Sequence, residues 1–324
     1  MASRVAVLVL AHATEPLQYL LDVLDRRFAV FIHLDAKGPD GAALRLPPNA
    51  RLVARPVPVF WGGWSMMRAT LLLIEAAMAA GPFERLALVS GDSLPVRGAD
   101  ALEAALRAPG VEYIELMDVQ DDPSLAGAAM QAAIDRHGWV QPWRFHNAVH
   151  WDHVLLNPTA AEAAAAQFGV PRERMDWIRG EAQRAVAGVL AELPPRPPLF
   201  RRLCYGTQWR ALSRPVLAAL LPTLRRPEVH AYFRHMQAPD EHMIQTVLGN
   251  RADLLGGRVL AGTPMFADHA RRAAGQDTLD AAGFRAAAGL GAQILFARKF
   301  APAAAPEVAG AIAAGRYEAD ILGG

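Results

Sequence analysis

Lysine and cysteine are both scarce in this chain of 324 residues. Lysine and arginine together number 33, yet only Lys37 and Lys299 are lysines. The single cysteine, Cys204, excludes an intrachain disulfide and suits a reducing compartment. The longest early apolar run, Val5–Ala11, is far shorter than the roughly 20 residues of a membrane helix. A formal net charge of +1 gives no general attraction to nucleic acid or acidic lipid. We therefore expect a cytoplasmic protein without a nucleic-acid partner or a transmembrane segment, and we leave peripheral association with the inner membrane open.

The first part of the chain, 1–120, alternates short apolar runs with helical patterns. This alternation predicts an α/β fold in which a mostly parallel, Rossmann-type sheet carries helices on both faces. The expected strands are Val5–Ala11, Ala29–Leu34, Leu52–Ala54, Leu86–Ser90 and Val111–Leu116, and the expected helices are Pro16–Arg26, Ser65–Ala80 and Ala99–Arg107. Ligands of such sheets bind beyond the carboxyl ends of the strands. We therefore expect His12, Asp35 and Asp92 to lie together at one rim.

Helices and irregular segments replace this alternation after about Asp118. The pattern predicts a short strand near Cys204–Trp209, helices near Pro215–Leu224 and Pro239–Leu248, and a late strand at Gln293–Ala297. We expect one domain over 1–300, with an N-terminal half (1–120) and a helical C-terminal half (121–300). An Ala/Pro-rich tail (301–324) follows and is expected to be a linker or a loosely packed helix.

The segment Pro239–Leu248 offers a carboxylate at the start of a helix. Asp240 can cap this helix, with Glu241 in the first turn, where the helix dipole favours negative charge. That interpretation is purely structural. A functional interpretation makes Glu241 a general base, because a rigid helix start fixes its geometry. Tyr232 and His235 would then form a neighbouring wall.

Aromatic and cationic side chains also allow two interpretations each. Trp64 and Trp209 either pack in the core or present an aromatic face to a sugar ring. Lys37 closes a strand-like run, and the pair Arg298-Lys299 is either a solvated strand end or an anion-binding site. A further cluster, with the approximate spacing of a zinc site, contains His146, His150 and His153. A nearby proline and the position of the third histidine disfavour zinc binding there.

The block Ser90-Gly91-Asp92-Ser93-Leu94 resembles the nucleophile motif of the GDSL esterases, in which Ser93 would attack an ester. Those enzymes also need a late Asp-x-x-His pair. None of the 10 histidines has an aspartate three residues before it. We keep this hydrolase as a minor alternative and otherwise place Ser93 in the turn.

A set of short motifs in register along the chain carries a more specific resemblance. These motifs are Leu10-Ala11-His12, Ile32-His33-Leu34-Asp35-Ala36-Lys37, Val59-Phe60-Trp61-Gly62-Gly63-Trp64-Ser65, Ala69-Thr70-Leu71, Leu88–Pro95, Tyr205–Ser213, Pro239-Asp240-Glu241 through Leu248, and Leu295–Phe300. In this order they resemble the core-2/I-branching β-1,6-N-acetylglucosaminyltransferases and the related peptide O-xylosyltransferases, glycosyltransferase family 14. The resemblance spans 5–300.

The resemblance implies a GT-A-like fold, a UDP-sugar donor and inversion at the anomeric carbon. It makes 1–120 the nucleotide-binding half and 121–300 the acceptor-binding and catalytic half. Glu241 resembles the base that deprotonates the acceptor hydroxyl, and Asp35 resembles a contact to the uridine. The donor-binding residues implied or expected at the same rim are His12, Asp35, Lys37, Asp92, Arg298 and Lys299. Those expected against the acceptor are Trp64, Trp209, Tyr232 and His235. A second family arginine could be Arg271, Arg272 or Arg285.

No Asp-x-Asp element, which holds a divalent ion in metal-dependent GT-A enzymes, occurs in the sequence. The leaving UDP still develops negative charge that must be stabilised. One opposite charge at roughly 4 Å, with an effective dielectric near 20, contributes about 4 kcal/mol before desolvation. We therefore expect Arg298 and Lys299 to replace a metal ion, so that the enzyme needs no cofactor.

The donor sugar stays open between GlcNAc and xylose, because motifs of both branches are present. The animal enzymes of this family have a membrane anchor and several disulfides, whereas this chain has one cysteine. We therefore expect a bacterial enzyme with a saccharide or peptide acceptor, a surface polysaccharide being more plausible than a mucin glycan. The alternative from another class is a nucleotide-sugar-binding protein that kept the fold and lost turnover.

Overall fold

A computed structural model describes 3–118, 171, 173–174, 199–234, 238–268, 271 and 276–323. Its centre is a five-stranded sheet with the order β3-β2-β1-β4-β9. The bounds are β1 Val5–Ala11, β2 Phe28–Leu34, β3 Ala50–Leu52, β4 Arg85–Ser90 and β9 Arg210–Ser213. The first four strands are parallel to their neighbours, and β9 runs antiparallel to β4. The predicted α/β class with a mostly parallel sheet is therefore confirmed.

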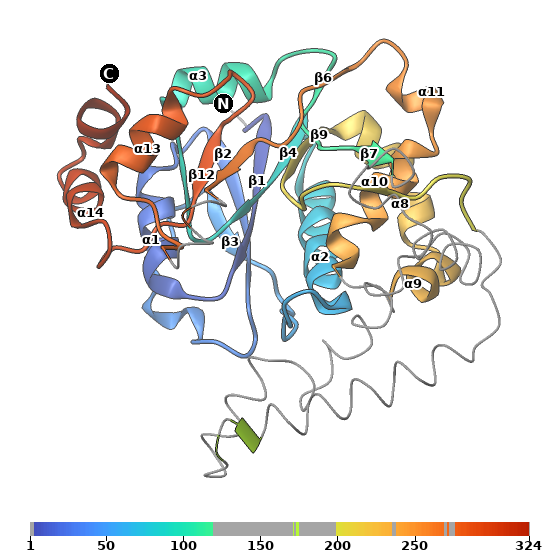
Figure 1. Cartoon of the computed structure of the whole chain (residues 1–324), viewed down its shortest axis with the longest axis horizontal. Coiled ribbons are helices and arrows are strands. Elements are labelled where there is room, and N and C mark those ends of the chain that lie inside the picture. Colours follow the sequence, from blue (N-terminus) through green and yellow to red (C-terminus); the bar gives the residue numbers. More distant parts are fainter. Residues whose placement is uncertain are drawn as a thin grey trace.

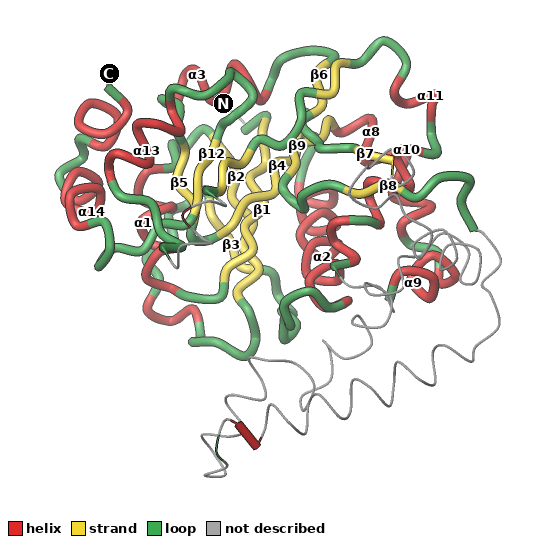
Figure 2. The backbone as a smooth tube through the Cα atoms, viewed as in Figure 1, coloured by secondary structure: helices red, strands yellow, loops and turns green. Residues whose placement is uncertain are grey.

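Helices pack on both sides of the sheet, so the side chains on both faces of its central strands are buried and mostly apolar. All seven residues of β2 are buried, which explains why this parallel strand has a continuous apolar run rather than an alternating one. Helix α1 (Thr14–Val23) lies on one side of the sheet, and α2 (Trp64–Ala80) lies on the other, against β1 and β2 (Figure 1). Figure 2 shows the strands enclosed between these helical layers.

Helix α2 connects the sheet's carboxyl rim to its amino edge. It begins after Gly62, whose φ of 75° lies in the left-handed region that glycine adopts readily. Along its 17 residues, buried positions such as Met67, Leu71 and Ile74 recur at helical spacing and face the sheet. The loop before α2 is therefore held at the same rim as the carboxyl ends of β1, β2 and β4.

A second sheet, of the order β11-β12-β5, brings the C-terminal part of the chain to the first part. Strand β12 (Phe296–Arg298) pairs antiparallel with β5 (Ser93–Pro95) and parallel with β11 (Met265–Ala267). Because β5 directly follows β4, this pairing places the end of β12 beside the end of β4. The tail is a packed part of the fold rather than a linker: α14 (Pro306–Ala313) buries Val308 and contacts α1.

The remaining described elements are shorter. They are η1 Gly41–Ala43, α3 Ala99–Leu106, β6 Val111–Glu112, β7 Met117–Asp118, β8 Cys204–Tyr205, α8 Arg214–Leu224, α9 Pro227–Phe233, η3 Pro239–Glu241, α10 Met243–Gly249, α11 Ala252–Leu255, β10 Val259–Leu260, α13 Ala281–Ala288 and η4 Glu318–Leu322. Within the described ranges, no helix combines the length and the hydropathy that crossing a membrane requires.

Most predicted elements of the first part are confirmed, but the strand predicted over Leu52–Ala54 lies earlier, as β3, and two further strands differ from the prediction. Of the strand predicted over Val111–Leu116, only Val111–Glu112 forms a strand, β6, while β7 begins just after the predicted end, at Met117, in another two-stranded sheet. Of the strand predicted near Cys204–Trp209, only Cys204–Tyr205 forms a strand, β8, and β9 begins at Arg210, just after the predicted segment. In both segments the chain passes from one sheet to another. Along the crossing the backbone is no longer paired as a strand.

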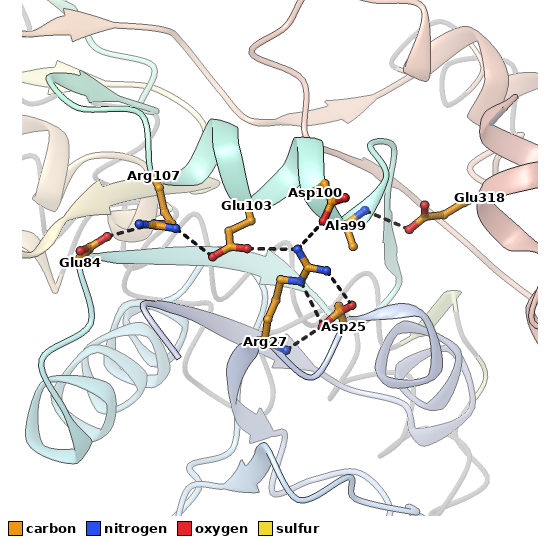
Figure 3. Close-up of polar contacts among 8 residues, drawn as sticks. All are labelled: Asp25, Arg27, Glu84, Ala99, Asp100, Glu103, Arg107 and Glu318. Atoms are coloured by element: carbon orange, nitrogen blue, oxygen red, sulfur yellow. Dashed lines mark hydrogen bonds and ion pairs between the residues drawn. The ribbon is translucent and has the colours of Figure 1, made fainter. Parts of the chain in front are cut away.

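Charged side chains form a network at the amino edge of the sheet (Figure 3). Arg27 Nη1 lies 2.6 Å from Asp100 Oδ1 and 3.1 Å from Glu103 Oε2, and Arg107 links Glu103 to Glu84 at 3.2 and 3.3 Å. Ion pairs that are open to solvent in this way each contribute little to stability. Arg27 and Glu84 precede β2 and β4, so the network lies at the edge opposite the rim and tethers α3 to the sheet.

Candidate functional site

The carboxyl ends of β1, β2 and β4 meet at one rim, as the sequence predicts. The backbone N–H of Asp35 donates to Ala11 O at 2.8 Å, and the N–H of Gly91 donates to Leu10 O at 2.7 Å. His12, which follows β1, is exposed, and its charge contributes to lowering the pKa of Asp92. His12, Asp35 and Asp92 therefore lie around the same edge.

Two glycines allow the segments of the rim to approach each other closely. A Cβ on Gly38 would lie 2.9 Å from His12 O, and a Cβ on Gly91 would lie 2.6 Å from the Cβ of Ala11. Both distances are too short for a side chain, so only glycine permits these approaches. Sequence analysis could have singled out Gly38, because it directly follows the Asp35-Ala36-Lys37 turn.

Asp35 accepts hydrogen bonds from the loop that precedes α2. Its Oδ1 accepts the N–H of Lys37 at 2.9 Å and the N–H of Val59 at 3.1 Å, and its Oδ2 lies 2.5 Å from Lys37 Nζ. The same ammonium donates to Val59 O and lies 4.8 Å from the centre of the Phe60 ring. Lys37 therefore orients Asp35, and a carboxylate fixed in this way can still accept a ligand's N–H or O–H.

His33 supports this loop from inside the sheet. It is 1% exposed, and its Nε2 accepts the N–H of Val57 at 3.0 Å. Because Nε2 accepts this hydrogen bond, the ring carries its proton on Nδ1, and burial lowers the pKa of His33. The sequence places His33 in the family motif, but its support of the Val57–Val59 segment could not be predicted from a local pattern.

Asp92 and Arg298 form a buried ion pair across the junction of β4 and β12. The Nε and Nη2 of Arg298 each donate to one oxygen of Asp92 at 3.1 Å. The hydroxyl of Ser90 also donates to Asp92, which is 6% exposed. Although burial alone would raise the pKa of Asp92, the guanidinium and the hydroxyl outweigh it and hold that pKa below its ordinary value.

Strand β12 is fixed at the rim by backbone pairing and by one arginine. Arg298 is opposite Ser93 in the register of β12 and β5, and the N–H of Phe300 donates to Asp92 O at 2.7 Å. Arg97 donates to four carbonyls in the segment before β12, at 2.8 to 3.0 Å. The position of Arg298 is therefore set by the second sheet rather than by a flexible strand end.

Several cations near this rim lie against carboxylates, as Lys37 and Arg298 do. Lys299 Nζ donates to Asp277, while Arg271, one of the three arginines proposed from the resemblance, pairs with Asp280 at 3.2 Å. The hydrogen bonds to Asp280 raise the pKa of Arg271 above its ordinary value. These pairings do not determine which of Arg271, Arg272 and Arg285 serves as the second family arginine.

Glu241 lies in a tight turn instead of in the first turn of a long helix. The predicted helix over Pro239–Leu248 is interrupted: η3 covers Pro239–Glu241, and α10 begins at Met243. Asp240 therefore does not cap α10, and the expectation that it does is wrong. The interruption is at His242, whose φ of −123° departs from the helical value of about −63°.

The turn that carries Glu241 is docked on the rim. The N–H of Ala238 donates to Gly62 O at 2.7 Å, and Glu241 O accepts the N–H of Gly206 at 3.1 Å. Gly62 lies two residues before the start of α2, and Gly206 lies between β8 and β9. Glu241 is therefore placed between the loop that holds Asp35 and the start of β9.

The side chains expected against the acceptor occupy different environments. Trp209 is 7% exposed and its ring lies 5.1 Å from the guanidinium carbon of Arg298, a residue expected on the donor side. Tyr232 is also 7% exposed and packs edge-on against Phe233 at 5.3 Å. Trp64 is partly buried, with its ring 5.1 Å from that of His230. His235 lies outside the described residues. An acceptor role for this set stays a prediction.

The esterase alternative receives no support from the structure. Ser93 has no exposed surface, and its hydroxyl donates to Ser90 O at 2.6 Å. A serine nucleophile must reach its substrate and have a base beside it. Ser93 instead stabilises the turn after β4, as the structural interpretation expects.

No group of three or more His, Cys, Asp or Glu side chains in the described ranges is arranged to hold a metal ion. The alternative zinc site at His146, His150 and His153 lies outside those ranges. The described rim does present carboxylates and cations suited to hydrogen-bonding a nucleotide and its phosphates. Whether catalysis needs a metal stays a prediction to be tested in solution.

Comparison with known proteins adds one finding. Residues 6–124 match the family model described as Branch: Core-2/I-Branching enzyme. This segment contains β2 to β7, all of β1 except Val5, and the rim residues His12, Asp35, Lys37 and Asp92. No curated protein matches the chain.

Proposed function

We propose that the chain is a glycosyltransferase of the core-2/I-branching enzyme family, whose model matches residues 6–124, and that it catalyses a specific reaction. The protein transfers GlcNAc or xylose from a UDP-sugar to a hydroxyl of a saccharide or peptide acceptor. The transfer inverts the anomeric carbon, forms a β-linkage and proceeds without a metal ion. Donor identity, acceptor class, inversion and metal independence all belong to the proposal.

The observation that supports it is the gathering of a fixed carboxylate, a buried ion pair and a docked acidic turn at one rim. Asp35 is held by Lys37 and by the backbone of Val59, where it can accept a hydrogen bond from the nucleoside. Arg298 lies across the end of β4 against Asp92. Glu241 belongs to a turn whose backbone is hydrogen-bonded to Gly62, through Ala238, and to Gly206.

The proposed reaction is a single in-line displacement. Glu241 accepts the proton of the acceptor hydroxyl while that oxygen forms a bond to the anomeric carbon of the sugar. The bond between this carbon and the diphosphate oxygen breaks, and UDP leaves with the bonding electron pair. Arg298 and Lys299 donate hydrogen bonds to the departing oxygens. Because attack and departure occur on opposite faces, an α-linked donor gives a β-linked product.

Replacement of Glu241 by glutamine tests the assignment of the base. Glutamine keeps the size of the side chain but cannot accept the proton, and a general base contributes roughly 10²–10⁴-fold to the rate. We expect Glu241→Gln to fold and to bind UDP, with transfer at least about a hundredfold slower. Glu307→Gln, an exposed carboxylate of α14, is the matched control and should keep its activity. Near-normal turnover by Glu241→Gln would reassign the base.

Donor hydrolysis and transfer should be measured with UDP-GlcNAc, UDP-xylose and UDP-glucose, each in the presence and absence of EDTA. We expect one UDP-sugar to be used and the rate to survive EDTA. Loss of turnover on chelation, restored by manganese, would refute metal independence. UDP binding without turnover of any donor would instead favour the nucleotide-sugar-binding alternative.

A further inference from the structure

Arg210 is a buried cation directly beneath the turn that carries Glu241. It is the first residue of β9 and is 3% exposed. Its Nη2 donates to Asp240 O at 2.5 Å, and its Nε donates to Gln208 O at 2.7 Å. A third contact joins Nη1 to Gln245 Oε1 at 3.4 Å. The guanidinium therefore connects the strand, the acidic turn and α10.

Gln245 extends this connection to the segment before β9. Its side-chain amide donates to Gly206 O at 3.1 Å and to Thr207 O at 2.9 Å. Gly206 in turn donates its N–H to Glu241 O. The backbone on both sides of Glu241 is thus hydrogen-bonded, directly or through Gln245, to the start of β9. Such fixation is what a base needs if its carboxylate is to meet a substrate proton at a defined place.

The charge of Arg210 acts on the same turn. Burial lowers the pKa of Arg210 to about 10, whereas the carboxylates of Asp240 and Glu241 act in the opposite direction. At neutral pH the guanidinium therefore remains protonated. Electrostatic interaction is mutual, so the cation that is stabilised by Glu241 also stabilises the ionised form of Glu241. An ionised carboxylate is the form that accepts a proton.

The neighbouring residue of Arg210 serves the other side of the rim. The ring of Trp209 lies 5.1 Å from the guanidinium carbon of Arg298, which holds Asp92. Of these two consecutive residues, Arg210 therefore contacts the acidic turn, and Trp209 contacts Arg298, the proposed leaving-group cation. Because consecutive Cα atoms are 3.8 Å apart, the start of β9 limits how far these two parts of the site can separate.

We propose that Arg210 is a positioning residue for Glu241: it holds the Pro239–Glu241 turn in place and keeps the Glu241 carboxylate ionised. This inference rests on the proposed function, in which Glu241 accepts the acceptor's proton. Arg210 itself touches neither the donor nor the acceptor. A replacement should therefore change the rate and the titration of the base more than it changes donor binding.

The test compares Arg210→Met, Arg210→Lys and the control Arg251→Met, which removes a partly exposed arginine from α11's start. With Arg210→Met we expect kcat to fall about ten- to a hundredfold, with the KM for the donor changed less than about threefold. The acidic limb of the pH–rate profile should move up by about one pH unit, because the carboxylate loses its neighbouring cation. Arg210→Lys should restore most of that limb, and Arg251→Met should leave both quantities unchanged.

A second readout does not depend on turnover. In protein labelled with ¹³C at glutamate carboxyls, the Glu241 signal is identified by its loss in Glu241→Gln, and its titration midpoint is followed by NMR. We expect an upward shift of about one pH unit in Arg210→Met and a smaller shift in Arg210→Lys. An unchanged titration midpoint of Glu241 in both variants would overturn the inference. A loss of activity no larger than the loss of folded protein would also overturn it. A shifted midpoint in a protein that transfers no sugar would overturn the proposed function and leave the electrostatic role of Arg210 standing.

Discussion

Replacing Arg298 by methionine should destabilise the protein mainly through the carboxylate that remains behind. Asp92 is 6% exposed and accepts two hydrogen bonds of 3.1 Å from the guanidinium. Removing one partner of a buried pair typically costs about 3–5 kcal/mol. The Arg298 side chain is 21% exposed, so water reaches part of the pair and reduces the cost. We therefore expect Arg298→Met to lower the free energy of unfolding by about 2–3 kcal/mol at pH 7.

The pH dependence distinguishes this mechanism from a simple loss of packing. In the native protein the pKa of Asp92 is lowered, so its contribution to stability is present above its unfolded pKa and is lost as pH falls through the folded value. In Arg298→Met, burial acts without the guanidinium and raises that pKa. The carboxylate then takes up a proton and loses its unfavourable charge at mild acidity. The difference in stability between wild type and Arg298→Met should therefore be largest near pH 7 and shrink toward pH 4.

Urea unfolding followed by tryptophan fluorescence at pH 7 and pH 4 measures both quantities. The double variant Asp92→Asn/Arg298→Met removes both charges, and we expect it to recover most of the lost stability at pH 7. A cost below about 1 kcal/mol for Arg298→Met at pH 7, or an equal cost at both pH values, would show that Arg298 does not neutralise a buried carboxylate.

Two further variants test the geometry and the charges of the rim. Gly91→Ala should lower the free energy of unfolding by about 1–3 kcal/mol in urea titrations, because its Cβ would meet that of Ala11 at 2.6 Å. Adding Ala11→Gly should restore part of this stability. Unchanged stability of Gly91→Ala alone would contradict the close approach. Asp277→Asn should tighten UDP binding about two- to fivefold in calorimetry, since it releases Lys299 from an exposed pair worth about 0.2–1 kcal/mol. Asp253→Asn, which disrupts a pair with Arg251 in α11, is the control, and weaker UDP binding by Asp277→Asn would speak against a diphosphate at Lys299.

The parts of the fold that the sequence predicts are those in which a single segment determines its own structure. Strand β1 has the predicted bounds because an uninterrupted run of apolar residues is covered by helices on both faces. The sequence does not predict the interruption at His242 of the helix expected over Pro239–Leu248, because no residue within this segment conflicts with a continuous helix. The turn is fixed instead by hydrogen bonds to Gly62 and Gly206, which are distant in sequence.

The candidate site follows the same division. The topology of a parallel sheet places Asp35 and Asp92 at one rim, whatever the rest of the chain does. The pair of Asp92 and Arg298 joins residues 206 positions apart, and no local pattern indicates it. The sequence does contain an indication of the role of Arg210: it is an isolated arginine at the start of the apolar strand Ala211-Leu212, and a buried arginine needs polar partners.

The pairing of charges at the rim changes the electrostatic argument for a reaction without metal. Lys37, Arg298 and Lys299 lie against Asp35, Asp92 and Asp277, so these three cations and three carboxylates sum to zero charge. The sequence-based figure of about 4 kcal/mol per cation counts no opposing carboxylate and is therefore an upper bound. A guanidinium has five N–H donors, and Asp92 occupies only the Nε and one Nη2 donor of Arg298. Arg298 can therefore keep Asp92 and still donate to a phosphate oxygen. Stabilisation of the leaving group then depends on short, directed hydrogen bonds from fixed cations rather than on net positive charge, and UDP binding should depend only weakly on salt.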